Sequence, residues 1–149
     1  MTHILAIHNS HNASVCEINN GNIIYFQEAE RLNKNKKSSE WTILLKKYQN
    51  KVFDKIIFVY TGFLKKEYYT DIVKNILFLE NIKYSKFIFE NNHHFFHACS
   101  AFFNSGLEKS YVLVADGSGS EDSNQNLEMI SLYYFNKNKY KKIFKLFKA

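Results

Sequence analysis

Three of the six histidines of the chain fall within five residues, at His93, His94 and His97. The surrounding phenylalanines and small residues predict a buried helix over 92–103. On that helix His93 and His97 project from one face, because residues four apart are neighbours on the helix surface, and the two imidazoles can share one metal ion. His94 points about a third of a turn away, so we expect a bystander or outer-sphere group. Taken alone, the pair favours a structural role, with its nitrogens bonded to backbone carbonyls.

An acidic residue further along the chain changes this balance. The apolar run 111–115 predicts a buried strand, and Asp116 follows it directly. A carboxylate at the carboxyl end of a strand lies where α/β folds bind their ligands. Two neutral imidazoles and one carboxylate suit a divalent metal, with iron(II) first and manganese or zinc after it. The alternative for Asp116 is a turn residue, since Asp-Gly is common in turns.

The turn after Asp116 consists of small residues that can approach an anion. Gly117, Ser118 and Gly119 offer backbone N–H groups and a hydroxyl for phosphate oxygens. A short Gly/Ser turn is a weak signal when it stands alone. It gains weight here only because it follows the predicted metal-binding acid.

Two further groups of polar residues lie near the start of the chain. His11 is in the turn after the apolar strand 4–7 and could act as a general base, because an imidazole titrates near neutral pH. A surface histidine with no role fits the same position equally well. Glu30, Arg31 and Lys34 follow the third predicted strand. Such a cluster is either a solvated edge or a contact for an anionic substrate.

Composition limits the function classes. The 149 residues are 46% hydrophobic, enough for an ordinary folded domain. The net charge of +6 comes almost entirely from lysine, and Arg31 is the only arginine, so nucleic acid is a minor hypothesis. Neither a membrane-length apolar run nor a signal pattern is present, which predicts a soluble, cytoplasmic protein without a membrane partner. Cys16 and Cys99 are expected to be buried free thiols.

The hydrophobic pattern predicts the elements that would position these residues. Strands are expected at 4–7, 13–18, 23–26, 55–60, 86–89, 111–116 and 130–135, and helices from 38 or 39 to 48, over 64–81 and over 92–103. The predicted apolar faces are Trp41, Leu44, Leu45 and Tyr48 in the first helix and Tyr69, Ile72, Val73, Ile76 and Leu79 in the second. Asn19, Asn20, Gly21 and Asn22 predict a tight hairpin. The order β-β-β-α-β-α-β-α matches the ribonuclease-H-like half-domain of the actin-like ATPase superfamily. We therefore expect this α/β half-domain over 1–109 and, over 110–149, the first hairpin of an incomplete second half-domain.

Four motifs in the same order resemble those of a known family. They are His11–Ser14, Ala29–Lys36, His93–Phe102 and Asp116–Gly119. Together they resemble the N-terminal part of the O-carbamoyltransferases of nodulation-factor and antibiotic biosynthesis, whose first domain is similar to the universal tRNA threonylcarbamoyladenosine-forming protein. Members of that family usually carry an acid in place of Asn12 and one of two paired glutamates in place of Ala29, so the first cluster departs from the pattern.

The resemblance implies a reaction and its participants. A carbamoyl group would pass from carbamoyl-adenylate, made from carbamoyl phosphate and ATP, to the hydroxyl of a small molecule such as a sugar. His93, His97 and Asp116 would hold the metal, Gly117, Ser118 and Gly119 would bind phosphate, and His11 would deprotonate the hydroxyl. Glu30, Arg31 and Lys34 would contact the substrate.

Relatives of this kind are several hundred residues long and carry a further metal-binding aspartate and a C-terminal catalytic domain. The resemblance therefore implies an N-terminal fragment of such an enzyme. The alternative is a non-catalytic metal- or nucleotide-binding remnant, or one subunit of a split enzyme whose C-terminal half is encoded separately and would be its partner. A neighbouring reading frame for the second half would favour the split enzyme. A weaker alternative is a basic nucleic-acid binder, but the expected nuclease carboxylates are not evident on the first and fourth strands.

We predict that the 149-residue protein alone turns over carbamoyl phosphate and ATP at a negligible rate, because one wall of the reaction site is missing. Release of pyrophosphate from ATP in the presence of carbamoyl phosphate measures this. Sustained turnover by the chain alone would contradict the prediction.

Overall fold

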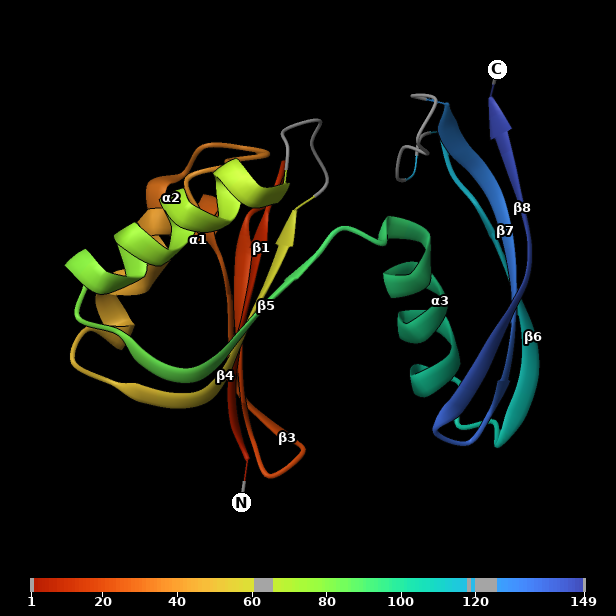
Figure 1. Ribbon diagram of the computed structural model, residues 1–149, viewed down its shortest axis with the longest axis horizontal. Helices are drawn as coiled ribbons and strands as arrows, with labels where there is room; N and C mark the ends of the chain where they lie inside the picture. Colours follow the sequence, from red (N-terminus) through yellow and green to blue (C-terminus); the bar gives the residue numbers. More distant parts are fainter. Residues whose placement is uncertain (1, 61–65, 118, 120–125, 149) are drawn as a thin grey trace. The chain divides into compact units, whose positions relative to one another are not determined.

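The computed structural model describes residues 2–60, 66–117, 119 and 126–148. The chain divides into two compact units, Met1–Glu90 and Asn91–Ala149, and each contains its own β-sheet (Figure 1). The helix that carries the three histidines belongs to the second unit by this division. The sequence pattern instead places it with the first half-domain over 1–109, and that boundary stays a prediction.

The first unit is a mixed α/β structure built on a five-stranded sheet with the order β3-β2-β1-β4-β5. The strands are β1 (His3–Asn9), β2 (Ser14–Asn19), β3 (Asn22–Glu28), β4 (Val52–Tyr60) and β5 (Lys83–Glu90). The first three strands pair antiparallel, whereas β4 pairs parallel with both β1 and β5. The strands predicted over 4–7, 13–18, 23–26, 55–60 and 86–89 are therefore all present, and the carboxyl ends of β1, β4 and β5 share one edge of the sheet.

The hairpin between β2 and β3 forms as predicted. Asn20 and Gly21 connect the strands, with φ angles of 50° and 83°. Asparagine and glycine tolerate the left-handed conformation that a two-residue hairpin loop requires. This turn sets the register that pairs Asn19 with Asn22.

Three helical segments accompany the first sheet within residues 2–60 and 66–90. They are α1 (Ala29–Asn33), η1 (Trp41–Tyr48) and α2 (Lys66–Leu79). The sequence pattern did not predict α1, and η1 is a 3-10 helix rather than the expected α-helix. The four apolar residues predicted for the face of η1 are nevertheless buried: Trp41, Leu44, Leu45 and Tyr48. Spacing of three and four residues identifies a buried face but does not fix the helical pitch.

The prediction for α2 was partly wrong about its buried face. Val73 is fully buried, and Tyr69 and Ile76 pack against the core as expected. Leu79, however, is 80% exposed, and Leu77 is buried in its place. Leu77 is four residues after Val73, and Leu79 is three residues after Ile76. Both spacings fit one face of a helix, so the sequence pattern could not choose between the two leucines. The predicted start at Leu64 lies outside the described residues.

In the described part of the second unit, one helix packs against a three-stranded antiparallel sheet of order β6-β7-β8. Its elements are α3 (His93–Asn104), β6 (Lys109–Ala115), β7 (Leu127–Asn136) and β8 (Lys139–Lys148). The predicted helix and the pairing of its two predicted strands are both present. The lysine-rich strand β8 was not predicted.

The core of the second unit contains residues from α3, β6 and β7: Ala98, Phe102, Val114, Tyr133 and Phe135. The rings of Phe102 and Phe135 stack with centroids 4.6 Å apart. Strand β6 is only half-buried, contrary to the expectation of a buried strand. Tyr111 and Leu113 are exposed, whereas Val112 and Val114 pack into the core, because successive side chains of a strand point to opposite faces.

Cys16 and Cys99 are both free, as expected, but each is only half-buried. Burial raises the pKa of both thiols. They are therefore protonated at neutral pH and poorly nucleophilic. Among the described residues, no helix combines the length and apolar character needed to cross a bilayer.

We predict that Phe102→Ala lowers the free energy of unfolding by about 3–5 kcal/mol, because it removes a buried ring from the core of the second unit. The matched control is Phe103→Ala. Phe103 is next in the chain but 58% exposed, so its loss should cost about 1 kcal/mol or less. Urea denaturation followed by circular dichroism measures both. Equal losses would contradict the assignment of the buried face of α3.

Candidate metal centre

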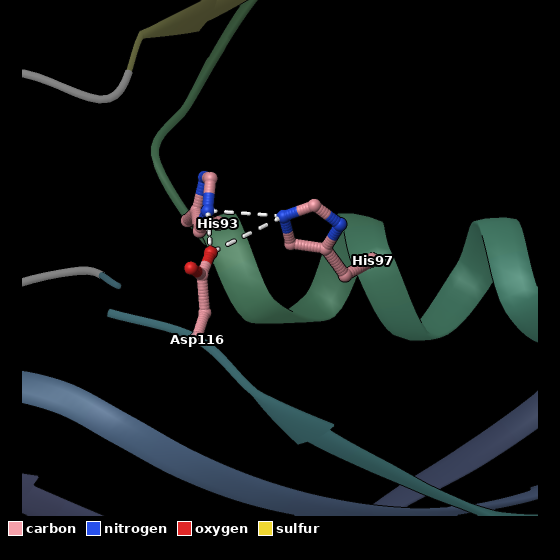
Figure 2. Close-up of side chains that lie close together, drawn as sticks. All are labelled: His93, His97 and Asp116. Carbon is pink, nitrogen blue, oxygen red and sulfur yellow. Dashed lines mark hydrogen bonds and ion pairs between the residues drawn. The ribbon is translucent and has the colours of Figure 1, made fainter. Parts of the chain in front are cut away.

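The two histidines of the centre come from the first turns of α3. The helix starts at His93, directly after Asn92, and residues four apart then share one face. His93 and His97 both extend toward Asp116 (Figure 2). The side chain of His93 is 25% exposed and that of His97 is 55% exposed, so both are accessible from solvent.

Asp116 approaches the histidines from the end of β6. Its backbone N–H donates to the carbonyl of Met129 on β7, at 3.1 Å, which extends the β6–β7 pairing by one residue. Its Oδ1 accepts a hydrogen bond from the Gly117 N–H, at 2.6 Å. The backbone and one carboxylate oxygen of Asp116 are thus fixed within the protein, and Oδ2 faces the imidazoles.

Three donor atoms converge at this point. Asp116 Oδ2 lies 2.8 Å from His93 Nε2 and 3.5 Å from His97 Nε2. The two Nε2 atoms lie 3.0 Å apart. Metal–ligand bonds of about 2.0–2.2 Å place two ligand atoms of one ion about 3.0 Å apart at a right angle and about 3.4 Å apart at the tetrahedral angle. The observed separations therefore fit the coordination sphere of a single divalent ion.

Electrostatics favours the anionic form of the carboxyl group. The hydrogen bond from His93 lowers the pKa of Asp116 below its usual 3.8, and this effect outweighs partial burial, which raises the pKa. The hydrogen bond from the Gly117 N–H lowers the pKa further. Asp116 is therefore ionised at neutral pH, as a metal ligand must be. Imidazole and carboxylate donors together suit iron(II), manganese or zinc.

The small residues after Asp116 are largely engaged within the protein. The Gly117 N–H bonds to Asp116, and the Gly119 N–H donates to the Glu128 carbonyl at 2.6 Å. Ser118 lies outside the described residues. Packing explains why residue 119 is a glycine, because a Cβ there would lie 2.7 Å from two atoms of the His94 ring. The predicted role of these three residues in phosphate binding stays a prediction.

The other predicted site residues belong to the first unit. His11 is exposed in the turn between β1 and β2. Ala29, the first residue of α1, donates its backbone N–H to the carbonyl of Ala13 in the same turn, at 2.8 Å. His11 and α1 therefore lie at the same edge of the first sheet. The assignment of His11 as a base for chemistry at the metal stays a prediction.

The residues of the predicted charged cluster lie on and directly after α1, where Arg31 pairs with two glutamates. The Arg31 guanidinium lies 3.3 Å from Glu28 and 3.9 Å from Glu30, and its side chain is 70% exposed. Glu30 also accepts the Lys37 N–H at 3.1 Å, and Lys34 ends α1 with a φ of 61°.

The two residues that depart from the motifs of the similar family suit their places in the structure. Asn12 has a φ of 63°, which asparagine tolerates, and Ala29 is fully buried.

A buried polar group behind the metal-binding face of α3 was not predicted from the sequence. His94, expected to be a bystander or an outer-sphere group, is fully buried together with Glu128 and Ser131. A register irregularity between Glu128 and Ile130 in the β7–β8 pairing turns Glu128 to the same face as Ser131, three residues later. Strict alternation would put these two side chains on opposite faces, so the sequence pattern contained no signal for the group.

Comparison with known proteins adds little to this picture. No protein-family model matches the chain. No curated protein matches it significantly. The solved structure of YeaZ from Pseudomonas aeruginosa is similar with a TM-score of 0.46 and 14% sequence identity, over 98% of this chain and 68% of that one. A likeness at this level carries no inference about function, which depends on the residues of the site.

We predict that Gly119→Ala destabilises the protein by about 1–3 kcal/mol, because the added methyl group would overlap the buried His94 ring. Gly117→Ala is the matched control, since no atom lies within 4 Å of a Cβ at that position. Thermal and urea denaturation compare the two variants. Equal stabilities would contradict the close packing of Gly119 on His94.

Proposed function

We propose that the chain binds one divalent metal ion through His93, His97 and Asp116 and belongs to a carbamoyl-transfer system of the O-carbamoyltransferase type. The observation that carries the proposal is the convergence of the three donor atoms at separations of 2.8, 3.0 and 3.5 Å. The order of the four sequence motifs supports the assignment of the reaction.

The proposal includes the fold. The first unit is assigned to the ribonuclease-H-like half-domain of the actin-like ATPase superfamily. Three antiparallel strands followed by two parallel strands, in the order β3-β2-β1-β4-β5, support this assignment. The second unit then starts the companion half-domain with the antiparallel strands β6, β7 and β8.

The residues have separate roles in the proposed reaction. A bound metal ion would supply Lewis-acid polarisation and positioning. His93 and His97 present imidazole nitrogens, and Asp116 presents an ionised oxygen whose partner oxygen accepts the Gly117 N–H. Iron(II) is the first choice of metal, followed by manganese or zinc.

The group transfer itself would conserve atoms as follows. The acceptor hydroxyl loses its proton to His11, and its oxygen forms a bond to the carbamoyl carbon. The bond between that carbon and the phosphate oxygen breaks, and AMP leaves with the bonding electrons. The exposed guanidinium of Arg31, with Lys34, would contact the anionic substrate, while Glu30 holds the local backbone through Lys37. The acceptor is a small molecule with a hydroxyl group, such as a sugar.

We predict that purified protein binds one iron(II), manganese or zinc ion per chain. His93→Ala should abolish this binding, because the two remaining ligands do not suffice to hold the ion. His11→Ala is the matched control, because this exposed histidine lies outside the metal-binding group. Metal analysis after equilibrium dialysis measures the ratio. Unchanged metal content in His93→Ala would rule out the proposed ligand set.

We further predict that metal-loaded protein binds a non-hydrolysable sulfamoyl analogue of carbamoyl-adenylate, because the ion is expected to position the carbonyl and phosphate groups. Titration calorimetry compares loaded protein, metal-free protein and His93→Ala. Metal binding without any affinity for the analogue would contradict the carbamoyl-transfer assignment and support a non-catalytic metal-binding module.

A further inference from the structure

A continuous chain of polar contacts crosses the interior of the second unit behind the metal centre. The Lys145 ammonium donates to Glu128 Oε2 at 2.7 Å. The Ser131 hydroxyl donates to Glu128 Oε1, and His94 Nδ1 lies 3.1 Å from Ser131 Oγ and 3.5 Å from Glu128 Oε1. His94, Ser131 and Glu128 are all completely buried. We call these three residues with Lys145 the buried relay.

The direction of the hydrogen bonds fixes the tautomer of His94. Ser131 gives its only proton to the Glu128 carboxylate, so its oxygen can only accept a bond from His94. His94 Nδ1 therefore carries the proton, and Nε2 of the neutral ring is an acceptor. Among the described residues that buried Nε2 has no hydrogen-bond partner. An unpaired buried acceptor is unfavourable, so filling space alone does not explain a histidine where leucine would pack without this penalty.

Glu128 is connected to both elements that supply the metal ligands. Its side chain holds α3 through Ser131 and His94, and His94 directly follows His93 in that helix. Its backbone carbonyl accepts the Gly119 N–H, and the carbonyl of the next residue, Met129, accepts the Asp116 N–H. Gly119 in turn lies against the His94 ring. The relay therefore contacts the helix that carries the imidazoles and the turn that carries the carboxylate.

We infer that His94 and the buried relay are positioning elements of the metal centre. They fix the rotation of the first turns of α3 about the helix axis and hold the backbone of Asp116 and Gly119 in place. The donor atoms of His93, His97 and Asp116 are therefore close together before a metal ion binds. This inference rests on the proposed metal-binding function. Outer-sphere partners of metal ligands typically change metal affinity by about 10- to 100-fold when they are mutated. His94 acts here through its neighbours and is not a ligand.

Two substitutions of His94 separate positioning from packing. His94→Asn keeps an N–H donor near the position of Nδ1 but leaves a small void, whereas His94→Leu fills the space and removes the donor. Positioning predicts that Leu lowers cobalt(II) affinity by about 10- to 100-fold, while Asn stays within about threefold of wild type. Leu should be at least as stable as Asn, so affinity and stability should rank the variants in opposite orders. Calorimetric titration and urea denaturation measure the two quantities, and wild-type affinity in His94→Leu would overturn the inference.

A second readout needs no metal. In metal-free protein the amide hydrogens of Asp116 and Gly119 should exchange at least tenfold faster in His94→Leu than in His94→Asn, with the core amide of Tyr133 as the internal reference. Unchanged exchange at both amides would overturn the positioning role. If wild type binds no cobalt(II), zinc or manganese, the proposed metal-binding function fails. The exchange rates still decide whether the relay holds the backbone of Asp116 and Gly119 in place.

Discussion

The attachment of α3 to the β6–β7 hairpin is the constraint on which the candidate centre depends. The helix supplies two donor atoms and the strand end supplies the third, so the donor set exists only while these elements stay in register. Apolar packing of Ala98 and Phe102 against Val114 and Phe135 provides the attachment. The buried relay adds direction, because hydrogen bonds require particular angles and apolar contacts do not.

The sequence predicted the parts of the centre that depend on local geometry. His93 and His97 share a face because they are four residues apart, and Asp116 lies near them because it ends a strand beside that helix. The strands of the first sheet followed from apolar runs, and the Asn20-Gly21 turn followed from backbone preferences. Each of these predictions rests on the conformation of a few consecutive residues.

The parts that could not be predicted depend on tertiary packing. A local irregularity in β7 turns Glu128 inward, and strict alternation of side chains gives no sign of it. The 3-10 pitch of η1 and the choice of Leu77 over Leu79 lie within the tolerance of the helical pattern. Strand β8 was missed because its lysines resemble a solvated segment. Two of the four relay residues, Glu128 and Lys145, come from these less predictable regions.

The central claim is that His93, His97 and Asp116 bind one metal ion together, and X-ray absorption spectroscopy of protein loaded with iron(II) tests it most directly. Joint coordination predicts a first shell of light atoms at about 2.0–2.2 Å that includes two imidazole nitrogens, with the multiple scattering that histidine rings produce. A spectrum with only oxygen ligands, or one that His93→Ala leaves unchanged, would contradict it.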